Sequence, residues 1–191
     1  MELQLDITKI YAIALEGGGA RGAYQVGAWR ALEEAGIRYN AVSGTSVGAL
    51  NGAMMAMGDL LNAEKLWKDI RFSQVMSVDD ETMDRIMKRD FENFDQLKAA
   101  FRTIWDIVKA GGVDVEPLRN LLDEWVDEEK IRSSGVEFFL PTYSLTDRES
   151  LEVVAGELPE GTLAGMLLAS AYFPAFKQEQ ISGKNYTDGG F

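Results

Sequence analysis

The stretch Val42–Leu50 (VSGTSVGAL) decides the fold, because it changes from strand to helix within a single tight turn. Its first residues have the character of a short buried strand, and the small and apolar residues at its end favour a helix. Ser46 stands between them at the centre of a G-x-S-x-G pattern. This pattern is typical of a nucleophile elbow, a strained turn that exposes a serine oxygen. Gly44 and Gly48 suit its flanks, because a strand and a helix that meet so closely leave no room for a Cβ.

The residues before this stretch show the same alternation of strand and helix. Lys9–Glu16 is a short apolar run suited to a first buried strand. Ala23–Ala35 has its apolar residues at helical spacing, and Gly36 follows as a C-cap. With Ala41–Ser43 as second strand and Val47–Met57 as an apolar helix, the order predicts the opening of a parallel α/β layer.

The middle of the chain, from about 59 to 130, is predicted to be helical. Its segments, which alternate acidic residues with Leu, Phe, Trp and Met, are Leu60–Ile70, Asp79–Lys88, Phe94–Val108 and Glu116–Glu128. Two interpretations stay open: an ordinary amphipathic layer over a sheet, and a cap that shapes an apolar substrate entrance. After this region we expect a hairpin over 136–154, a helix over 162–172 and a last hairpin over 180–187.

Composition and charge exclude several classes of protein. The chain has 191 residues, of which 46% are hydrophobic and 26% charged, as expected for one soluble domain. The formal net charge of −12 argues against a nucleic-acid partner, and it disfavours adsorption to anionic membranes. The N-terminus does not have the pattern of a secretory signal, and no run approaches the length of a transmembrane helix, so we expect at most transient membrane contact.

Two residue types are missing, and both absences limit the chemistry. The sequence contains no cysteine, which rules out disulfides and thiolate chemistry within these residues and fits a reducing, cytoplasmic location. It also contains no histidine, so a Ser-His-Asp triad or a histidine metal site cannot be built from them. If Ser46 is a nucleophile, its base must be a carboxylate or a lysine.

A glycine-rich loop after the first strand is the second strong signal. Gly17, Gly18 and Gly19 can turn several backbone N–H groups toward one point beside a helix N-terminus, which creates an anion site. The anion could be a nucleotide phosphate, because Gly17, Gly19 and Gly22 also satisfy G-x-G-x-x-G. That fold expects an acidic residue at the end of the second strand, and none is present. Next to a nucleophile elbow, the loop is better interpreted as an oxyanion site.

Two further residues are candidates for the chemistry. Arg21 lies inside the glycine loop, where it could support the loop or reach a phosphate on the substrate. Asp188 follows a strand-like segment and precedes Gly189 and Gly190, which would let the backbone bend sharply and leave the carboxylate free to approach Ser46. An Asp-Gly pair alone is usually a turn.

Three motifs together resemble the signature of patatin-like phospholipases. They are Gly17–Gly22 (GGGARG), Gly44–Gly48 (GTSVG) and Asp188–Gly190 (DGG), in that order along the chain. Leu168–Pro174 (LASAYFP) resembles the Ala-Ser helix and following proline that precede the Asp motif in this family. The resemblance runs from the first strand to the end of the sequence and is weakest in the helical middle.

The resemblance implies a fold and a set of roles. The fold would be a three-layer α/β/α arrangement around a mostly parallel central sheet, in one domain over 1–191 with a helical, cap-like insertion at about 60–130. Ser46 would be the nucleophile and Asp188 the general base of a dyad without histidine, and the Gly17–Gly19 backbone would form the oxyanion hole. Family members usually continue beyond the Asp-Gly-Gly motif, so we expect the family's C-terminal portion to be absent here.

The expected function is that of a serine acyl hydrolase, of the lipase or phospholipase A type, acting on carboxylic esters of lipid-like substrates. No metal or cofactor is needed for this reaction. An acyltransferase with the same dyad and a non-catalytic lipid-binding protein are alternatives, and a nucleotide-binding protein of Rossmann type is a weaker one. A surface left uncovered by missing residues would favour a homo-oligomer.

Overall fold

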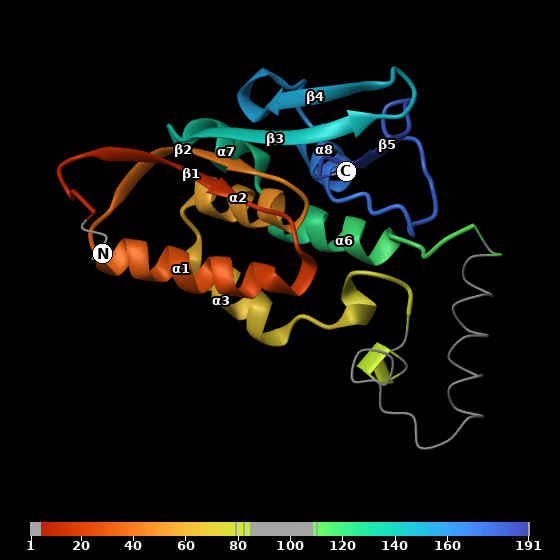
Figure 1. Ribbon diagram of the computed structural model, residues 1–191, viewed down its shortest axis with the longest axis horizontal. Coiled ribbons are helices and arrows are strands. Elements are labelled where there is room, and N and C mark those ends of the chain that lie inside the picture. The colour runs from red at the N-terminus through yellow and green to blue at the C-terminus, as the bar shows by residue number, and fades with distance from the viewer. Residues whose placement is uncertain (1–4, 79, 82, 85–108, 110, 191) are drawn as a thin grey trace.

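The computed structural model describes residues 5–78, 80–81, 83–84, 109 and 111–190 (Figure 1). Its first half alternates as the sequence predicts: β1 (Ile10–Leu15), α1 (Gly22–Glu34), β2 (Arg38–Gly44) and α2 (Val47–Met57). The second strand begins earlier than predicted. The remaining helices and strands are α3 (Leu60–Asp69), α6 (Glu116–Trp125), α7 (Glu128–Ser133), β3 (Glu137–Ser144), β4 (Glu149–Val154), α8 (Leu163–Ser170) and β5 (Tyr186–Asp188), and the short 3₁₀ helices are η1 (Gly19–Arg21), η2 (Phe72–Gln74) and η3 (Ala155–Glu157).

The strands form one mixed sheet in the order β1-β2-β3-β4, with β5 added to β3. β1, β2 and β3 run parallel, and β4 and β5 run antiparallel to β3. The α/β fold with a mostly parallel central sheet is therefore confirmed. Since β1 and β2 are parallel neighbours, the glycine loop and the elbow leave the sheet at the same edge.

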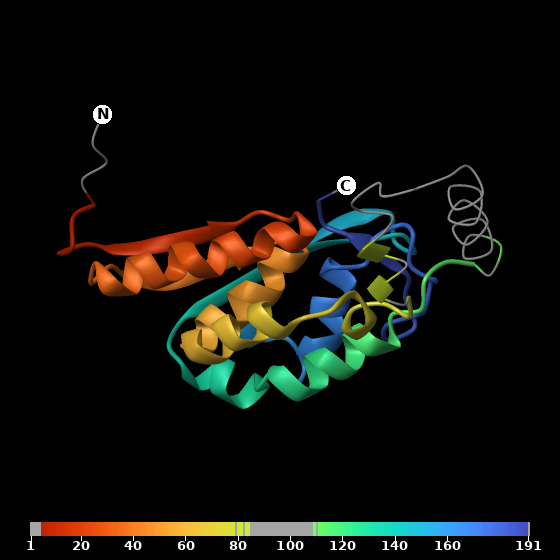
Figure 2. The same ribbon diagram turned by 90° about the horizontal axis from the view of Figure 1, so that it is seen from below.

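In the described residues, helices cover one face of the sheet, so the second helical layer of the expected three-layer arrangement is not seen there. The alternation of burial along the strands turns Val42, Phe138 and Leu140 inward, where they are almost fully buried. α2 packs on β2 and β3, α8 packs on β3 and β5, and α1, α3 and α6 pack against these two helices. Figure 2 shows α1, α2, α3, α6 and α8 on the same side of the strands. Along the opposite face, alternate strand residues such as Ala12 and Phe139 are exposed or half-buried.

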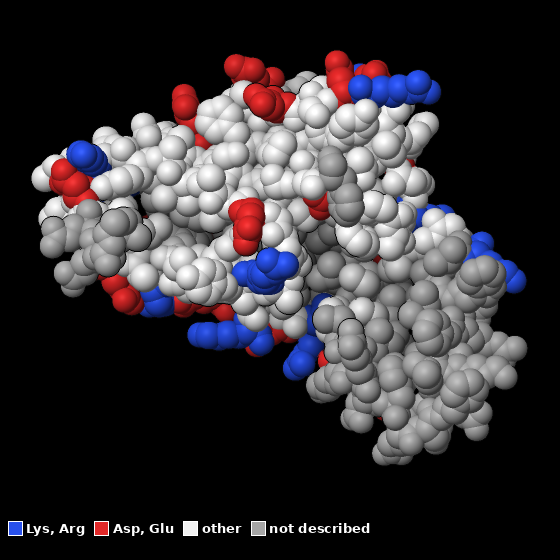
Figure 3. Space-filling view, in the orientation of Figure 1, with Lys and Arg blue, Asp and Glu red and all other residues white. Residues whose placement is uncertain are grey.

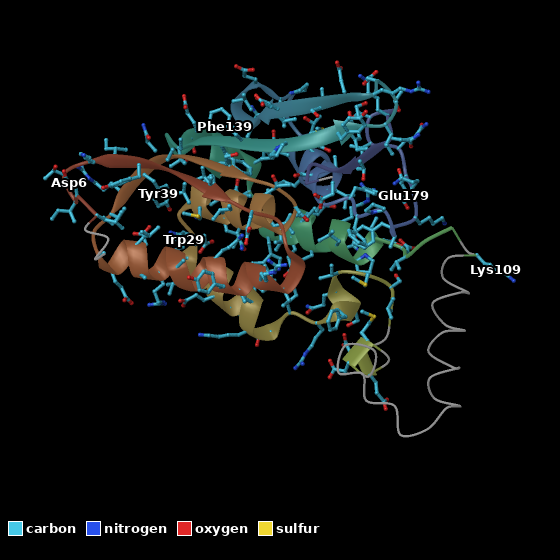
Figure 4. The ribbon with its side chains drawn as sticks, in the orientation of Figure 1. Asp6, Trp29, Tyr39, Lys109, Phe139 and Glu179 are labelled. Carbon is cyan, nitrogen blue, oxygen red and sulfur yellow. The ribbon has the colours of Figure 1, made fainter. Side chains whose placement is uncertain are left out.

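Side-chain hydrogen bonds to Glu33 join α1 to β2. Trp29 Nε1 and the Tyr39 hydroxyl both donate to Glu33 Oε1, at 3.0 Å and 3.5 Å. Figure 4 labels Trp29 and Tyr39, which come from α1 and β2. Burial raises the pKa of Tyr39 to about 12, and the neighbouring Glu33 carboxylate adds to the shift.

The predicted hairpin over 136–154 is present as β3 and β4, but the last predicted hairpin needs a correction. Ile181 and Lys184 form only an isolated bridge, around a tight turn in which Ser182 and Gly183 have positive φ angles. The chain that follows does not pair back on the segment before the turn. It becomes β5 and pairs with Thr142–Ser144 of β3, because the free edge of β3 beyond β2 offers a longer ladder.

Of the predicted helices in the middle of the chain, Leu60–Ile70 is confirmed by α3 and Glu116–Glu128 by α6, which ends three residues earlier than predicted. Asp79–Lys88 lies largely, and Phe94–Val108 entirely, outside the described residues. None of the helices in the described ranges combines the length and apolar character needed to span a bilayer. In Figure 3 acidic side chains gather along the edge over β4, while the surface over β1 is mainly uncharged.

Candidate active site

The elbow has the backbone geometry that its sequence predicts. Ser46 has φ 55° and ψ −127°, a conformation that non-glycine residues rarely adopt. A Cβ on Gly44 would lie 2.1 Å from the Gly48 oxygen, and a Cβ on Gly48 would lie 2.5 Å from the Leu15 oxygen. Both glycines are therefore required by close backbone contacts at the crossing of β1, β2 and α2.

The Ser170 hydroxyl of α8 connects the elbow to the sheet through two hydrogen bonds. Ser170 is fully buried, and its Oγ accepts a hydrogen bond from the Ser46 N–H at 3.2 Å. The same oxygen donates to the Pro141 carbonyl of β3 at 2.7 Å. Ser170 thus ties the strained residue directly to the central strand.

The glycine loop lies beside Ser46. A Cβ on Gly17 would lie 3.2 Å from the Ser46 Cβ, so the two residues are in contact. Gly18 and Gly19 have φ angles of 146° and 56°. Within the described residues, their N–H groups donate no hydrogen bond, and neither does the N–H of Val47 at the start of α2. The site therefore offers unpaired backbone donors beside the positive end of a helix.

Asp188 reaches the same place from β5. Its backbone N–H donates to the Tyr172 carbonyl at 2.9 Å, and its Oδ1 accepts from the Gly190 N–H at 2.8 Å. The residue is only 6% exposed. A Cβ on Gly190 would lie 3.6 Å from Thr45 Cγ2, so the turn after Asp188 packs against the elbow. Among the described residues, no hydrogen bond joins Asp188 to the Ser46 hydroxyl.

Tyr172 anchors the segment that carries Asp188. Its hydroxyl donates to the Lys177 carbonyl and accepts from the Glu179 N–H at 2.8 Å. Burial raises the pKa of this phenol above its ordinary value. The neutral hydroxyl therefore holds the loop between α8 and β5 over a wide pH range.

A cavity of about 1100 Å³ opens over these residues. It is somewhat larger than the roughly 300–1,000 Å³ of most small-molecule sites. Of the residues named from the sequence, Gly17, Gly18, Gly19, Arg21, Ser46 and Asp188 all line it. Its walls are mainly apolar and come from α2, α3, η2, α6 and the segment after α8, including Met54, Trp67, Phe72, Leu121 and Phe176.

Gly22, Gly44 and Gly48 do not line the cavity. A Cβ on Gly22 would lie 2.3 Å from Trp67 Cζ2 and 2.6 Å from Val47 Cγ2. Gly22 is therefore required by the close packing of α1 against Trp67 and Val47, whereas Gly44 and Gly48 are required by the backbone contacts of the elbow. The G-x-G-x-x-G pattern thus combines a loop and a packing contact.

Arg21 is exposed at the cavity rim, and its side chain forms no hydrogen bond or ion pair with the residues that the structure describes. Its Nε would lie 3.4 Å from a Cβ on Gly18, so the side chain lies along the loop. Both interpretations of Arg21, as support for the loop and as a substrate contact, stay open. No three acidic side chains in the described ranges come together in a way that could hold a metal ion.

Sequence reasoning overlooked Val47 and two polar residues next to the loop, Asn51 and Gln25. A signal for Asn51 was available, because it is the only polar side chain of the helix Val47–Met57. A buried amide in such a helix needs hydrogen-bond partners, and these tend to be important for local geometry. No signal in the sequence distinguished Gln25 from the other polar residues of α1.

Comparison with known proteins agrees with the fold and the motifs. A family model described as patatin-like phospholipase matches residues 13–191. Lysophospholipase nte1 of Aspergillus terreus is 59% identical over 44 residues, which are 23% of this chain and 3% of that protein. Patatin-like phospholipase domain-containing protein 7 of Rattus norvegicus is 41% identical over 75 residues, 37% of this chain and 6% of that protein.

The crystal structure of VipD from Legionella pneumophila superimposes with a TM-score of 0.60 at 19% identity, covering 95% of this chain and 46% of that one. This likeness concerns the fold. The chain spans a small part of the curated relatives it matches, and under half of VipD. Because the family model covers nearly all of the sequence and the fold agrees with it, the chain belongs to the patatin-like phospholipase family.

Proposed function

We propose that the protein hydrolyses carboxylic esters of lipid-like substrates, with Ser46 as nucleophile and Asp188 as general base. The observation that supports this proposal best is the shared cavity. A strained serine, a buried carboxylate and unpaired N–H groups all line one mainly apolar space. These are the groups that an acyl transfer to serine requires.

The reaction would proceed in two halves. Asp188 accepts the proton of the Ser46 hydroxyl while Oγ attacks the ester carbonyl, and the carbonyl oxygen becomes an oxyanion. Collapse of this intermediate breaks the bond to the alcohol oxygen, which takes the proton from Asp188. A water molecule then gives its proton to Asp188 and attacks the acyl-serine, which releases the carboxylic acid and returns the proton to Ser46.

The burial of Asp188 supports its role as a base. A general base must be held in a fixed position within reach of the proton that it accepts. At 6% exposure, Asp188 is largely shielded from solvent. Its carboxylate accepts one backbone hydrogen bond through Oδ1, which orients the group but leaves the second oxygen available.

The oxyanion would be held by backbone donors of the Gly17–Gly19 loop. The N–H groups of Gly18 and Gly19 make no hydrogen bond to other described residues, so they need not break one to receive the charge. The N–H that follows the nucleophile, from Val47, commonly contributes to such a site. Preorganised donors of this kind are typically the largest single contribution to acyl transfer.

The cavity walls suit an acyl chain. Leu50, Met54, Leu66, Ile70 and Leu118 are among the side chains that extend the apolar surface away from Ser46. Burial of apolar surface contributes about 25 cal/mol per Å², or roughly 0.8 kcal/mol for each methylene. We therefore expect kcat/KM to rise with acyl length until the cavity is filled. α3, η2 and α6 supply much of this wall, which favours the interpretation of the middle region as a cap.

Labelling with a fluorophosphonate probe, followed by peptide mapping, tests the proposal directly. We expect one adduct, on Ser46, and loss of label in Ser46→Ala with the control Ser150→Ala labelled normally. Asp188→Asn should lower kcat on a p-nitrophenyl ester by roughly 10²–10⁴-fold, because general-base catalysis contributes that much. Asp147→Asn serves as its control. A native protein that binds lipid without labelling would instead be a non-catalytic lipid-binding member.

A further inference from the structure

A buried amide connects the apolar helix α2 to the glycine loop. Asn51 is 3% exposed, and all of its hydrogen-bonding atoms have partners. Its Nδ2 donates to the Gly22 carbonyl at 2.9 Å and to Gln25 Oε1 at 2.8 Å, and its Oδ1 accepts from Trp67 Nε1 at 2.8 Å. One side chain of α2 is thus joined to α1 and α3.

Gln25 extends this connection to the other end of the loop. Its Nε2 donates to the Glu16 carbonyl at 2.7 Å. Glu16 is the residue immediately before Gly17, and Gly22 is the first residue of α1 after Arg21. The two amides therefore hold the loop at the carbonyl on either side of it, and they are hydrogen-bonded to each other.

In this hydrogen-bond network, the groups at the two ends determine which atom donates and which accepts in each bond. The indole N–H of Trp67 can only donate, so the oxygen of Asn51 must face it and the amide nitrogen must face the loop. The Glu16 carbonyl can only accept, so Gln25 must present its nitrogen there and its oxygen to Asn51. Both amides have a single satisfied orientation, which makes the arrangement rigid.

We infer that Asn51 and Gln25 are positioning residues that clamp the glycine loop and so aim its N–H donors at the oxyanion. This inference rests on the proposed function. Gln25 does not line the cavity, and Asn51 lines it with all of its polar atoms already bonded to other protein groups, so neither amide is available to bond the reacting atoms. Their effect passes through the loop backbone.

The loop needs such a clamp because its own residues supply little rigidity. Gly18 and Gly19 have no side chains to pack and occupy φ angles that glycine reaches easily but does not prefer strongly. Among the described residues, the loop's own hydrogen bonds lie at its C-terminal end, where the Arg21 N–H donates to the Gly18 carbonyl and the Gly22 N–H donates to the Gly19 carbonyl. An oxyanion hole acts through preorganisation, so N–H donors without a fixed position would stabilise the oxyanion much less.

Trp67 links the clamp to the substrate cavity. Its ring lines the cavity and contacts Gly22, while its N–H orients Asn51. The side-chain amide that fixes the loop is therefore held in place by a wall of the acyl site. Figure 4 shows that α1, α2 and α3, which supply these three side chains, lie next to one another.

The test compares the native protein with Gln25→Met, Gln25→Glu and Asn51→Ala. Gln25→Met keeps the length of the side chain and removes both of its bonds, whereas an ionised Gln25→Glu keeps only an acceptor. Because Gln25 is half-buried, its two variants should fold. Arg30→Met is the matched control: it breaks the pair between Arg30 and Glu64, which also joins α1 to α3 but lies away from the loop.

We expect kcat on a p-nitrophenyl ester to fall by roughly 10²-fold in each clamp variant, as for small displacements of catalytic groups, with KM changed by less than about threefold. Rates are normalised to the fraction of Ser46 that reacts with the fluorophosphonate probe. Affinity for a trifluoromethyl ketone, which forms a hemiketal oxyanion on serine, should fall by the same factor as kcat/KM, while affinity for the fatty-acid product stays constant.

The test distinguishes failure of the clamp from failure of the proposed function. If Gln25→Met and Arg30→Met both retain the native kcat and ketone affinity, the clamp does not position the loop, although the proposed function stands. If the native protein neither labels nor hydrolyses esters, the proposed function itself fails. Equal losses of ketone and product affinity in the clamp variants would indicate general disruption of the cavity and would also overturn the inference.

Discussion

The strain at Ser46 can be measured separately from catalysis by two substitutions of the same residue. Its φ of 55° and ψ of −127° place an L-amino acid in a sparsely populated region, at a cost of about 1–3 kcal/mol. Ser46→Ala keeps this strain and removes a hydroxyl that makes no hydrogen bond among the described residues. We therefore expect its free energy of unfolding to stay within about 0.5 kcal/mol of the native value.

Ser46→Gly relieves the strain, because glycine adopts this conformation without a Cβ conflict. Against this gain stands the greater entropy of glycine in the unfolded chain, about 0.5–1 kcal/mol. The difference predicts that Ser46→Gly is more stable than Ser46→Ala by about 1 kcal/mol at the middle of these ranges and by up to about 2.5 kcal/mol, equivalent to a few degrees in Tm for a domain of this size. Urea denaturation of both variants measures it. A glycine variant no more stable than the alanine variant would refute the strained-elbow reasoning.

Three further predictions concern the elbow, the α8 hydroxyl that supports it, and an ion pair between the β3–β4 turn and the segment before β5. Gly44→Ala should lower the free energy of unfolding by about 3 kcal/mol or more in urea denaturation, because its Cβ would lie 2.1 Å from a backbone oxygen of α2. Ser170→Ala should leave the buried Ser46 N–H without its partner, lowering stability by about 1–3 kcal/mol and reducing kcat in the ester assay, whereas Ser170→Thr should restore part of both. The hydrogen bond between Lys184 and Asp147 lowers the pKa of Asp147 and raises that of Lys184. The contribution of this pair to the free energy of unfolding should therefore be lost below about pH 4, where Asp147 is protonated, and above about pH 10.5, where Lys184 loses its proton. In Lys184→Met the urea midpoint should depend less on pH in these two ranges.

The local features of the site could be predicted from the sequence because they depend on neighbouring residues. A strand, a turn and a helix within Val42–Leu50 determine the elbow almost alone, and the backbone contacts of Gly44 and Gly48 follow from that crossing. The glycine loop is equally local, since positive φ angles at Gly18 and Gly19 need only glycine. The order of β1, α1, β2 and α2 was correct for the same reason.

The parts that depend on distant contacts could not be predicted in this way. The side chains of Asn51, Gln25 and Trp67 meet only after three helices have packed, and no periodicity indicates that an amide of α2 will face a loop after β1. The pairing of the last strand with β3 was also missed. A hairpin was expected because a tight turn precedes it, but turn chemistry alone does not say which edge a strand will join.

The position of Asp188, the proposed base, depends on the pairing of distant strands, whereas that of Ser46, the proposed nucleophile, depends on a local turn. β3 pairs with β2 at Glu137–Phe139 and with β5 at Thr142–Ser144. Because β2 runs parallel and β5 antiparallel to β3, the C-terminal ends of β2 and β5 face each other along one edge of β3. A slip of one residue in the second pairing would turn Asp188 to the opposite face of the sheet, away from Ser46.

Several contacts specify that register. Asp188 pairs with Thr142, whose hydroxyl donates to the Thr187 carbonyl at 3.0 Å, and a Cβ on Gly189 would lie 2.4 Å from the Pro141 oxygen. Pro141 is also the residue whose carbonyl receives the Ser170 hydroxyl that holds the elbow. The nucleophile and its proposed base are therefore placed by adjacent residues of β3, which makes this strand, and neither motif alone, the element that sets their relative position.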